Sequence, residues 1–129
     1  MTGALGLLRL GAALPQALHP ALGSAMGSAL RRLVRGRAAV ARDNLALCFP
    51  EQSAAAREDL VAAHFQALGR GLLGLGMAWW APPARLHGLA DVTGLEHLQD
   101  ALARGHGVIL LSGHFTDLEL GGRLLALHP

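Results

Sequence analysis

The chain has 129 residues, enough for one domain with a modest core, and 52% of them are hydrophobic. Its mean hydropathy of +0.37 is high for a soluble domain of this size, so a membrane-associated protein is among the classes to consider. Residues 1–50 contain six of the eleven arginines and only one of the nine acidic residues. This part therefore has a net charge of +5, and the remainder has a net charge of −3.

The first predicted element is an uncharged apolar segment over residues 10–30. Pro15 and Pro20 interrupt it, so it is a poor candidate for a transmembrane span. Because arginines follow the apolar part, a cleavable signal peptide is disfavoured. The pattern favours a membrane-seated pair of helices whose arginines face anionic headgroups on the cytoplasmic side, and an alanine-rich helix packed on the domain is the alternative. No aromatic residues interleave these arginines, which argues against a nucleic-acid partner. The arginines are Arg31, Arg32, Arg35 and Arg37.

A long helix is expected after Pro50, with Ser53 as its N-cap and with Pro82 and Pro83 ending it. Apolar residues recur in alternating steps of four and three, which predicts one apolar stripe. Four glycines would each cost about 1 kcal/mol relative to alanine, so they indicate close approach of another backbone or a lipid-facing surface. The stripe is Val61, Phe65, Leu68, Leu72, Leu75 and Trp79, and the glycines are Gly69, Gly71, Gly74 and Gly76.

Two other side chains in this part have alternative interpretations. Trp79 and Trp80 fit a membrane interface or the core equally well. Cys48, the single cysteine, excludes an internal disulfide and is expected to be a small buried residue and not a nucleophile.

A β/α alternation follows, which places the fold in the α/β class. A short strand over residues 91–93, a helix over 95–104, a strand over 108–112 and a helix from 117 towards 127, capped by Thr116, are expected. The uninterrupted Val-Ile-Leu-Leu run predicts a strand covered on both faces, and therefore a parallel sheet layered by helices. Two strands cannot bury those faces, so we expect the front part of a larger protein. Residues 1–36 would form the apolar, basic, membrane-associating segment, and residues 37–129 the first part of the α/β domain.

His114 and Glu119 are the candidate catalytic residues, because they stand where a buried strand meets a helix. In one continuous helix their side chains would point about 140° apart, so they can meet only if His114 precedes the helix. A carboxylate from the first turn could then fix the imidazole tautomer and leave the other ring nitrogen free to accept a proton. The alternative is a capping box, in which Glu119 bonds the backbone and His114 is an ordinary loop residue.

Four short segments carry a family resemblance: NLALCFPE at residues 44–51, GMAWW at 76–80, VTGLEHL at 92–98 and GVILLSGHFTDLELGGR at 107–123. In this order they resemble the late acyltransferases of lipid A biosynthesis, the lauroyl and myristoyl transferases of Gram-negative inner membranes. The resemblance implies a glycerolipid-acyltransferase-like α/β fold of the lysophospholipid acyltransferase-like superfamily, with an N-terminal membrane anchor. It also implies that His114 and Glu119 are the His-x4-Asp/Glu catalytic pair.

By that similarity, the reaction is acyl transfer from an acyl carrier protein thioester to a hydroxyl of a lipid A precursor, at the cytoplasmic face of the inner membrane. The implied partners are the acyl carrier protein, the lipid A precursor and inner-membrane lipids, with no metal and no cofactor besides the acyl donor. Candidate substrate-binding residues are Phe115, Asn44 and Arg123. Two other functions stay open: a non-catalytic membrane-peripheral fragment or scaffold, and an acyltransferase of glycerophospholipid type.

Overall fold

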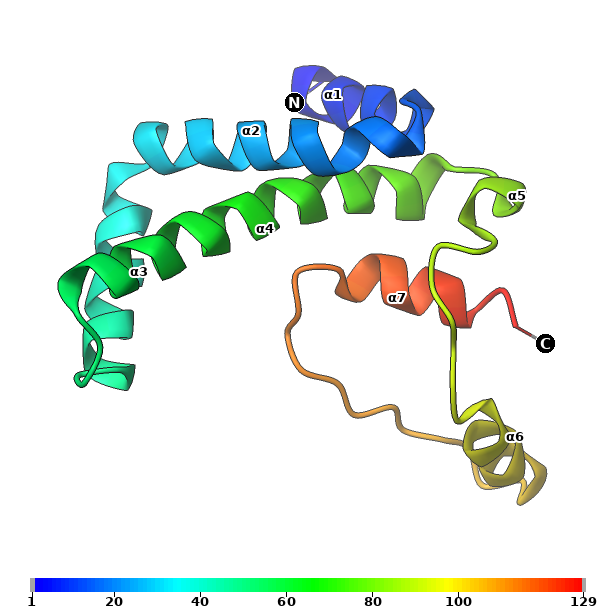
Figure 1. Cartoon of the computed structure of the whole chain (residues 1–129). Helices are drawn as coiled ribbons and strands as arrows, with labels where there is room; N and C mark the ends of the chain where they lie inside the picture. The colour runs from blue at the N-terminus through cyan, green and yellow to red at the C-terminus, as the bar shows by residue number, and fades with distance from the viewer. Residues whose placement is uncertain (1, 129) are drawn as a thin grey trace.

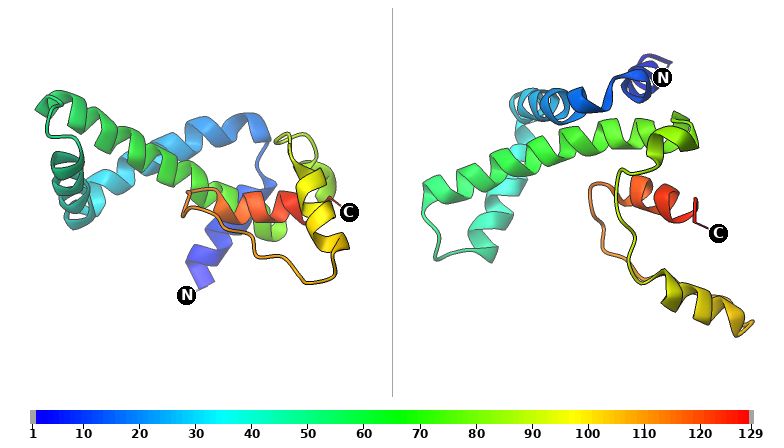
Figure 2. Two further views of the ribbon diagram at one scale, coloured as in Figure 1. Left: turned by 90° about the horizontal axis from the view of Figure 1, so that it is seen from below. Right: turned by 45° about the vertical axis from the view of Figure 1, so that its right-hand side comes forward.

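A computed structural model describes residues 2–128, and this part of the chain is built from helices. Helices α2 and α4 run antiparallel along each other, α3 crosses the beginning of α4, and α7 lies against the opposite side of α4 from α2 (Figure 1). Helix α6 stands apart from this assembly in a second view (Figure 2). In chain order the elements are α1 (Thr2–Ala13), the 3-10 helix η1 (Gln16–Leu18), α2 (His19–Leu33), α3 (Arg35–Cys48), α4 (Ala54–Trp80), α5 (Pro83–Leu86), α6 (Leu95–Ala103) and α7 (Leu118–Leu125).

The long helix α4 confirms the prediction made from its end signals. The Ser53 hydroxyl accepts a hydrogen bond from the Ala56 backbone N–H at 3.1 Å, as an N-cap residue does. The helix runs for 27 residues and ends at Trp80, just before the Pro82–Pro83 pair. Local capping and proline chemistry therefore set both ends of the central element of the fold.

Glycines let the backbones of α2 and α4 touch. A Cβ on Gly69 would overlap the carbonyl oxygen of Gly23 and lie 2.5 Å from the backbone nitrogen of Gly27. In the same way, a Cβ on Gly27 would overlap the carbonyl of Phe65. Close approach of another backbone, one of the two explanations for the glycines of the long helix, is therefore confirmed at Gly69.

The buried side chains form two small clusters, one along the first half of α4 and one at its end. The first joins Ala38 of α3 to Val61 and Phe65 of α4. The second cluster joins α4 to the segment that follows it, and its members are Met77, Ala81 and Leu86. The predicted single stripe is therefore correct at its beginning and wrong at its end, where Trp79 is 55% exposed. The stripe divides because α2 and α3 contact one face of α4, whereas Leu68, Leu72 and Leu75 face the segment before α7.

The two predicted strands are wrong for this structure, because residues 2–128 contain no strand. Residues 90–94 and 107–115 form neither helix nor strand, and they do not run side by side (Figure 1). A strand needs a neighbouring strand to satisfy its backbone N–H and C=O groups, and the described residues provide none. The run that was expected to be buried on both faces is instead exposed, with Ile109 at 94% and Leu111 at 98%. The layered sheet is therefore not formed within this part of the chain.

Cys48 is exposed, which contradicts the expectation of a buried thiol, because it is the last residue of α3 and lies where the chain turns away towards α4. Among the helices described over residues 2–128, none combines the length and the apolarity that a bilayer crossing requires.

An ion-pair cluster joins α2, α3 and α4 near the beginning of α4. Glu58 of α4 accepts hydrogen bonds from Arg31 of α2 at 2.9 Å and from Arg42 of α3 at 2.7 and 3.0 Å. The hydrogen bonds from Arg42 are the main reason that the pKa of the Glu58 carboxyl is lowered. All three side chains are partly exposed, so we expect a modest and salt-sensitive contribution to stability.

We predict that Gly69→Ala destabilises the fold by about 1–3 kcal/mol, because the new methyl group forces two helix backbones apart. Gly36→Ala is the matched control, since Gly36 also lies in a helix and a Cβ there meets nothing within 4 Å. Urea unfolding should show a lower midpoint for the first variant and an unchanged or higher midpoint for the second. Equal stability of the two variants would contradict the backbone contact.

We also predict an acid-sensitive contribution from Glu58. Because the folded-state pKa of this carboxyl is lowered, its stabilising effect is present above the unfolded-state pKa of about 4.3 and is lost as pH falls through the folded-state value. Thermal unfolding from pH 7 to pH 3 should therefore show a smaller loss of Tm for Glu58→Gln than for the wild type. Glu51→Gln, which removes an exposed carboxylate that bonds to no described residue, should leave the wild-type profile unchanged.

Candidate active site

The candidate site lies where the segment after α6 returns to α4 and turns into α7. His114 lies in the loop ahead of α7, and Glu119 is the second residue of that helix, in its first turn. The structure therefore gives the one arrangement in which the two side chains can meet, a histidine before the helix and a carboxylate on its opening turn.

The helix begins one residue later than expected, and Thr116 is not its cap. Asp117 holds the N-cap position with φ −103° and ψ 24°, and no side chain caps the helix. Thr116 instead sits against α4, where a Cβ on Gly71 would overlap the Thr116 methyl group and lie 2.8 Å from its carbonyl oxygen. The capping-box alternative is not formed either, since no hydrogen bond to Glu119 occurs among the described residues, and its carboxylate stays available.

Glycines of α4 thus position the loop that carries His114. Besides the contact of Gly71 with Thr116, a Cβ on Gly74 would lie 2.9 Å from the Asp117 carboxylate. At Gly71 the loop therefore approaches the α4 backbone more closely than any other residue type would allow, whereas at Gly74 only the end of the Asp117 side chain lies close.

His114 and Glu119 line one cavity of about 300 Å³. Leu68, Leu72 and Leu75 of α4 form its apolar floor. Both candidate side chains are exposed to solvent, and no hydrogen bond joins them within residues 2–128. Hydrogen bonds between catalytic groups are often long before substrate binds, so the arrangement allows proton transfer without displaying the final geometry.

The three candidate substrate-binding residues lie in different places. Phe115 is 72% exposed and lines the same cavity as His114. Arg123 lies one turn beyond Glu119 and shares with it a second hollow of about 430 Å³, beside Trp79. Asn44 lies on α3, away from both hollows, in a groove between α3 and α4. The structure therefore gathers Phe115 and Arg123 around the pair and separates Asn44 from it.

Sequence reasoning missed His64 and did not assign Leu68 to the site. Both residues line the cavity of His114 and also the groove that contains Asn44. The available signal was a histidine four residues before Leu68 and eight before Leu72, a spacing that places all three on one face of a helix. Within residues 2–128, no three histidine, cysteine, aspartate or glutamate side chains lie close enough together to hold a metal ion.

The chain matches one family of known proteins. Residues 3–129 match the family model described as bacterial lipid A biosynthesis acyltransferase. The chain is 42% identical over 123 residues to a lipid A biosynthesis palmitoleoyltransferase of Escherichia coli (strain K12), which covers 95% of this chain and 40% of that protein. It is 41% identical over 92 residues to a lipid A biosynthesis lauroyltransferase of the same organism, which covers 71% of this chain and 30% of the relative.

A lipid A biosynthesis acyltransferase of Haemophilus influenzae is 37% identical over 92 residues, covering 71% of this chain and 29% of the relative. The chain thus spans two fifths or less of the length of these curated relatives. No solved structure matches the chain.

Proposed function

Since the chain belongs to the bacterial lipid A biosynthesis acyltransferase family, we propose that its protein transfers a fatty acyl group from an acyl carrier protein to a hydroxyl of a lipid A precursor. The observation that supports this proposal most directly is the shared cavity of His114 and Glu119, with the histidine ahead of α7 and the carboxylate on its first turn. The apolar floor from α4 suits an acyl substrate.

In this proposal His114 is the general base. Its imidazole takes the proton from the acceptor hydroxyl as the oxygen attacks the thioester carbonyl carbon. The carbon–sulfur bond then breaks, and the carrier thiol leaves with the proton that His114 returns. Glu119 orients the imidazole and stabilises its protonated form through a hydrogen bond that forms when substrate binds. No covalent acyl-enzyme is needed, since the hydroxyl attacks the donor directly.

Phe115 and Arg123 are proposed to contact the substrates beside this pair. The exposed Phe115 ring at the cavity offers apolar surface to an acyl chain. Arg123 has no carboxylate within ion-pair distance among the described residues, so it can bind an anionic group of the acceptor or donor.

Attachment to the cytoplasmic face of the inner membrane is proposed for residues 1–36. Leu18 and Leu22 expose apolar surface near the start of α2, and arginines cluster at its end. This pairing of apolar and basic surface is typical of segments that lie on anionic bilayers. Residues 37–129 then contribute to the acyltransferase domain.

A layered α/β fold is also part of the proposal, for a protein of the relatives' length. The exposed run over residues 108–111 has the composition of a strand buried on both faces, and such apolar exposure favours burial against further chain. Neighbouring strands would satisfy its backbone groups and fix the loop of His114 at the end of a strand.

Amide hydrogen exchange tests this strand. We expect the amides of residues 108–112 to exchange rapidly in the 129-residue chain and to be protected in a protein of the relatives' length, because sheet hydrogen bonds slow exchange. The amides of α4 serve as the internal control, protected in both. Rapid exchange of 108–112 in the longer protein would contradict the sheet.

The catalytic proposal is tested with His114→Ala in a protein of the relatives' length. Acyl transfer from a lauroyl-loaded carrier protein to a lipid A precursor should fall about 10²- to 10⁴-fold, the usual contribution of a general base. Glu119→Gln should lower kcat while the fold and the recovery in the inner-membrane fraction stay unchanged. His106→Ala, an exposed histidine in the preceding loop, is the matched control.

Two outcomes would count against the assignment. Normal turnover by folded His114→Ala protein would remove the general base. Transfer to lysophosphatidate in preference to the lipid A precursor would point to a glycerophospholipid-type acyltransferase instead.

A further inference from the structure

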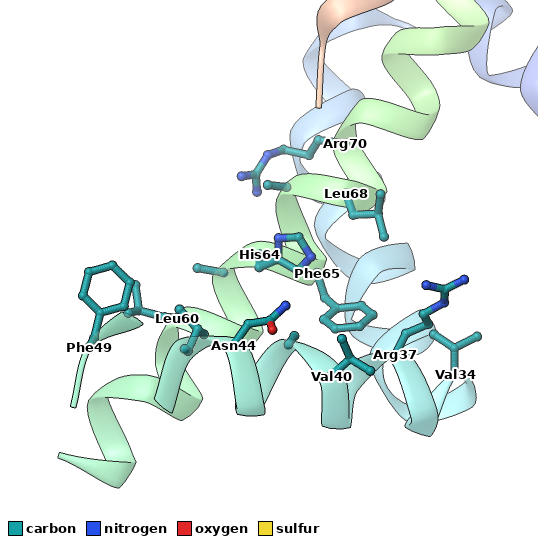
Figure 3. Close-up of a pocket in the computed structure, with 14 residues that line it drawn as sticks. Val34, Arg37, Val40, Asn44, Phe49, Leu60, His64, Phe65, Leu68 and Arg70 are labelled. Atoms are coloured by element: carbon teal, nitrogen blue, oxygen red, sulfur yellow. The ribbon is translucent and has the colours of Figure 1, made fainter. Parts of the chain in front are cut away.

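The groove that contains Asn44 is a third and larger hollow, and it lies between α3 and α4. It is an open groove of about 910 Å³, inside the range of about 300–1,000 Å³ in which proteins bind small apolar ligands (Figure 3). Its walls are mainly apolar and come from both helices and from the turn after α3. The largest of its exposed apolar residues are Val34, Val40, Phe49, Leu60 and Leu68.

The charge of this groove is one-sided. Arg37 of α3 and Arg70 of α4 line it, and no acidic side chain does. Arg37 bonds to no described residue, and Arg70 donates only to the neutral hydroxyl of Ser24, at 2.9 Å. By contrast, Arg31 and Arg42 are both paired with Glu58. The folded structure therefore leaves two cations beside an apolar trough with no carboxylate to neutralise them, a surface complementary to an anionic amphiphile.

The groove adjoins the candidate active site. His64 and Leu68 line both the groove and the cavity of His114 and Glu119. An acyl chain that lies along α4 in the groove would therefore point past His64 and Leu68 towards the cavity of His114.

We propose that the α3–α4 groove holds a fatty acyl chain of a phosphate-bearing lipid, with the anionic head at Arg37 and the chain directed along α4 towards His114. This inference rests on the proposed function for its purpose, but the binding itself does not require turnover. Asn44 lies in the wall of this groove. Arg37 also lies there, whereas four other arginines line a different hollow: Arg31, Arg32, Arg35 and Arg42.

Two probes that carry the same dodecyl chain test binding in the groove, in a protein of the relatives' length. The probes are monododecyl phosphate, which is anionic, and dodecyl maltoside, which is neutral, both below their micelle concentrations and measured by titration calorimetry. Ala63→Trp places a large side chain on an exposed groove position and should weaken both probes at least tenfold. Ala39→Trp, an exposed α3 position outside the groove, should change neither.

Arg37→Gln tests the charge separately. It should weaken the phosphate about tenfold, as expected for the loss of a charge-assisted hydrogen bond, and leave the maltoside unchanged. Arg104→Gln, which removes an exposed arginine just after α6, should leave both unchanged. If Ala63→Trp fails to fold, Leu60→Glu at a position already 38% exposed introduces a charge into the same wall and should also weaken both probes.

The outcomes separate the groove from the catalytic proposal. Unchanged binding in Ala63→Trp and Leu60→Glu would overturn the groove, even if His114→Ala abolishes turnover. Stronger association of Ala63→Trp with anionic vesicles, without loss of probe binding, would show that this face contacts a bilayer and would also overturn it. Loss of probe binding together with normal turnover in His114→Ala would support the groove and reject the general base.

Discussion

The backbone contact between α2 and α4 is the constraint on which the rest of the structure depends. Gly23, Gly27 and Gly69 leave no room for a side chain, so the two helices are held at the distance of touching backbones. With α2 fixed on one side, α4 presents its opposite side to the loop before α7. Gly71 makes a similar close contact there, with the Thr116 backbone and methyl group.

Helix α4 consequently lines both the cavity of the candidate catalytic pair and the α3–α4 groove. Val61 and Phe65 anchor it to α3, while Leu68 and its neighbours on the next turns form the floor beneath His114 and one wall of the groove. Because one helix contributes to the core, to the cavity and to the groove, a shift of α4 would move the core, the loop of His114 and the groove together. The proposed catalytic and lipid-binding surfaces therefore share a scaffold.

Charge is divided between structure and surface in a way that the overall composition does not reveal. Glu58 holds Arg31 and Arg42 and so binds α2, α3 and α4 to one another. Arg37, five residues before Arg42 in the same helix, has no such partner and lies in the groove. Positions on α3 therefore decide whether an arginine stabilises the fold or remains available to an anionic ligand.

The sequence by itself determined the features that depend on neighbouring residues in the chain. Ser53 and the Pro82–Pro83 pair set the limits of α4, and His114 was correctly expected ahead of a helix that carries Glu119 in its first turn. Tertiary contacts alone decided the rest: which face of α4 is buried, that Thr116 packs on Gly71 and caps nothing, and that residues 108–112 form no strand. Capping and proline effects act within a turn of helix, whereas a strand or a buried face exists only when a distant segment lies against it, and no local pattern specifies that partner.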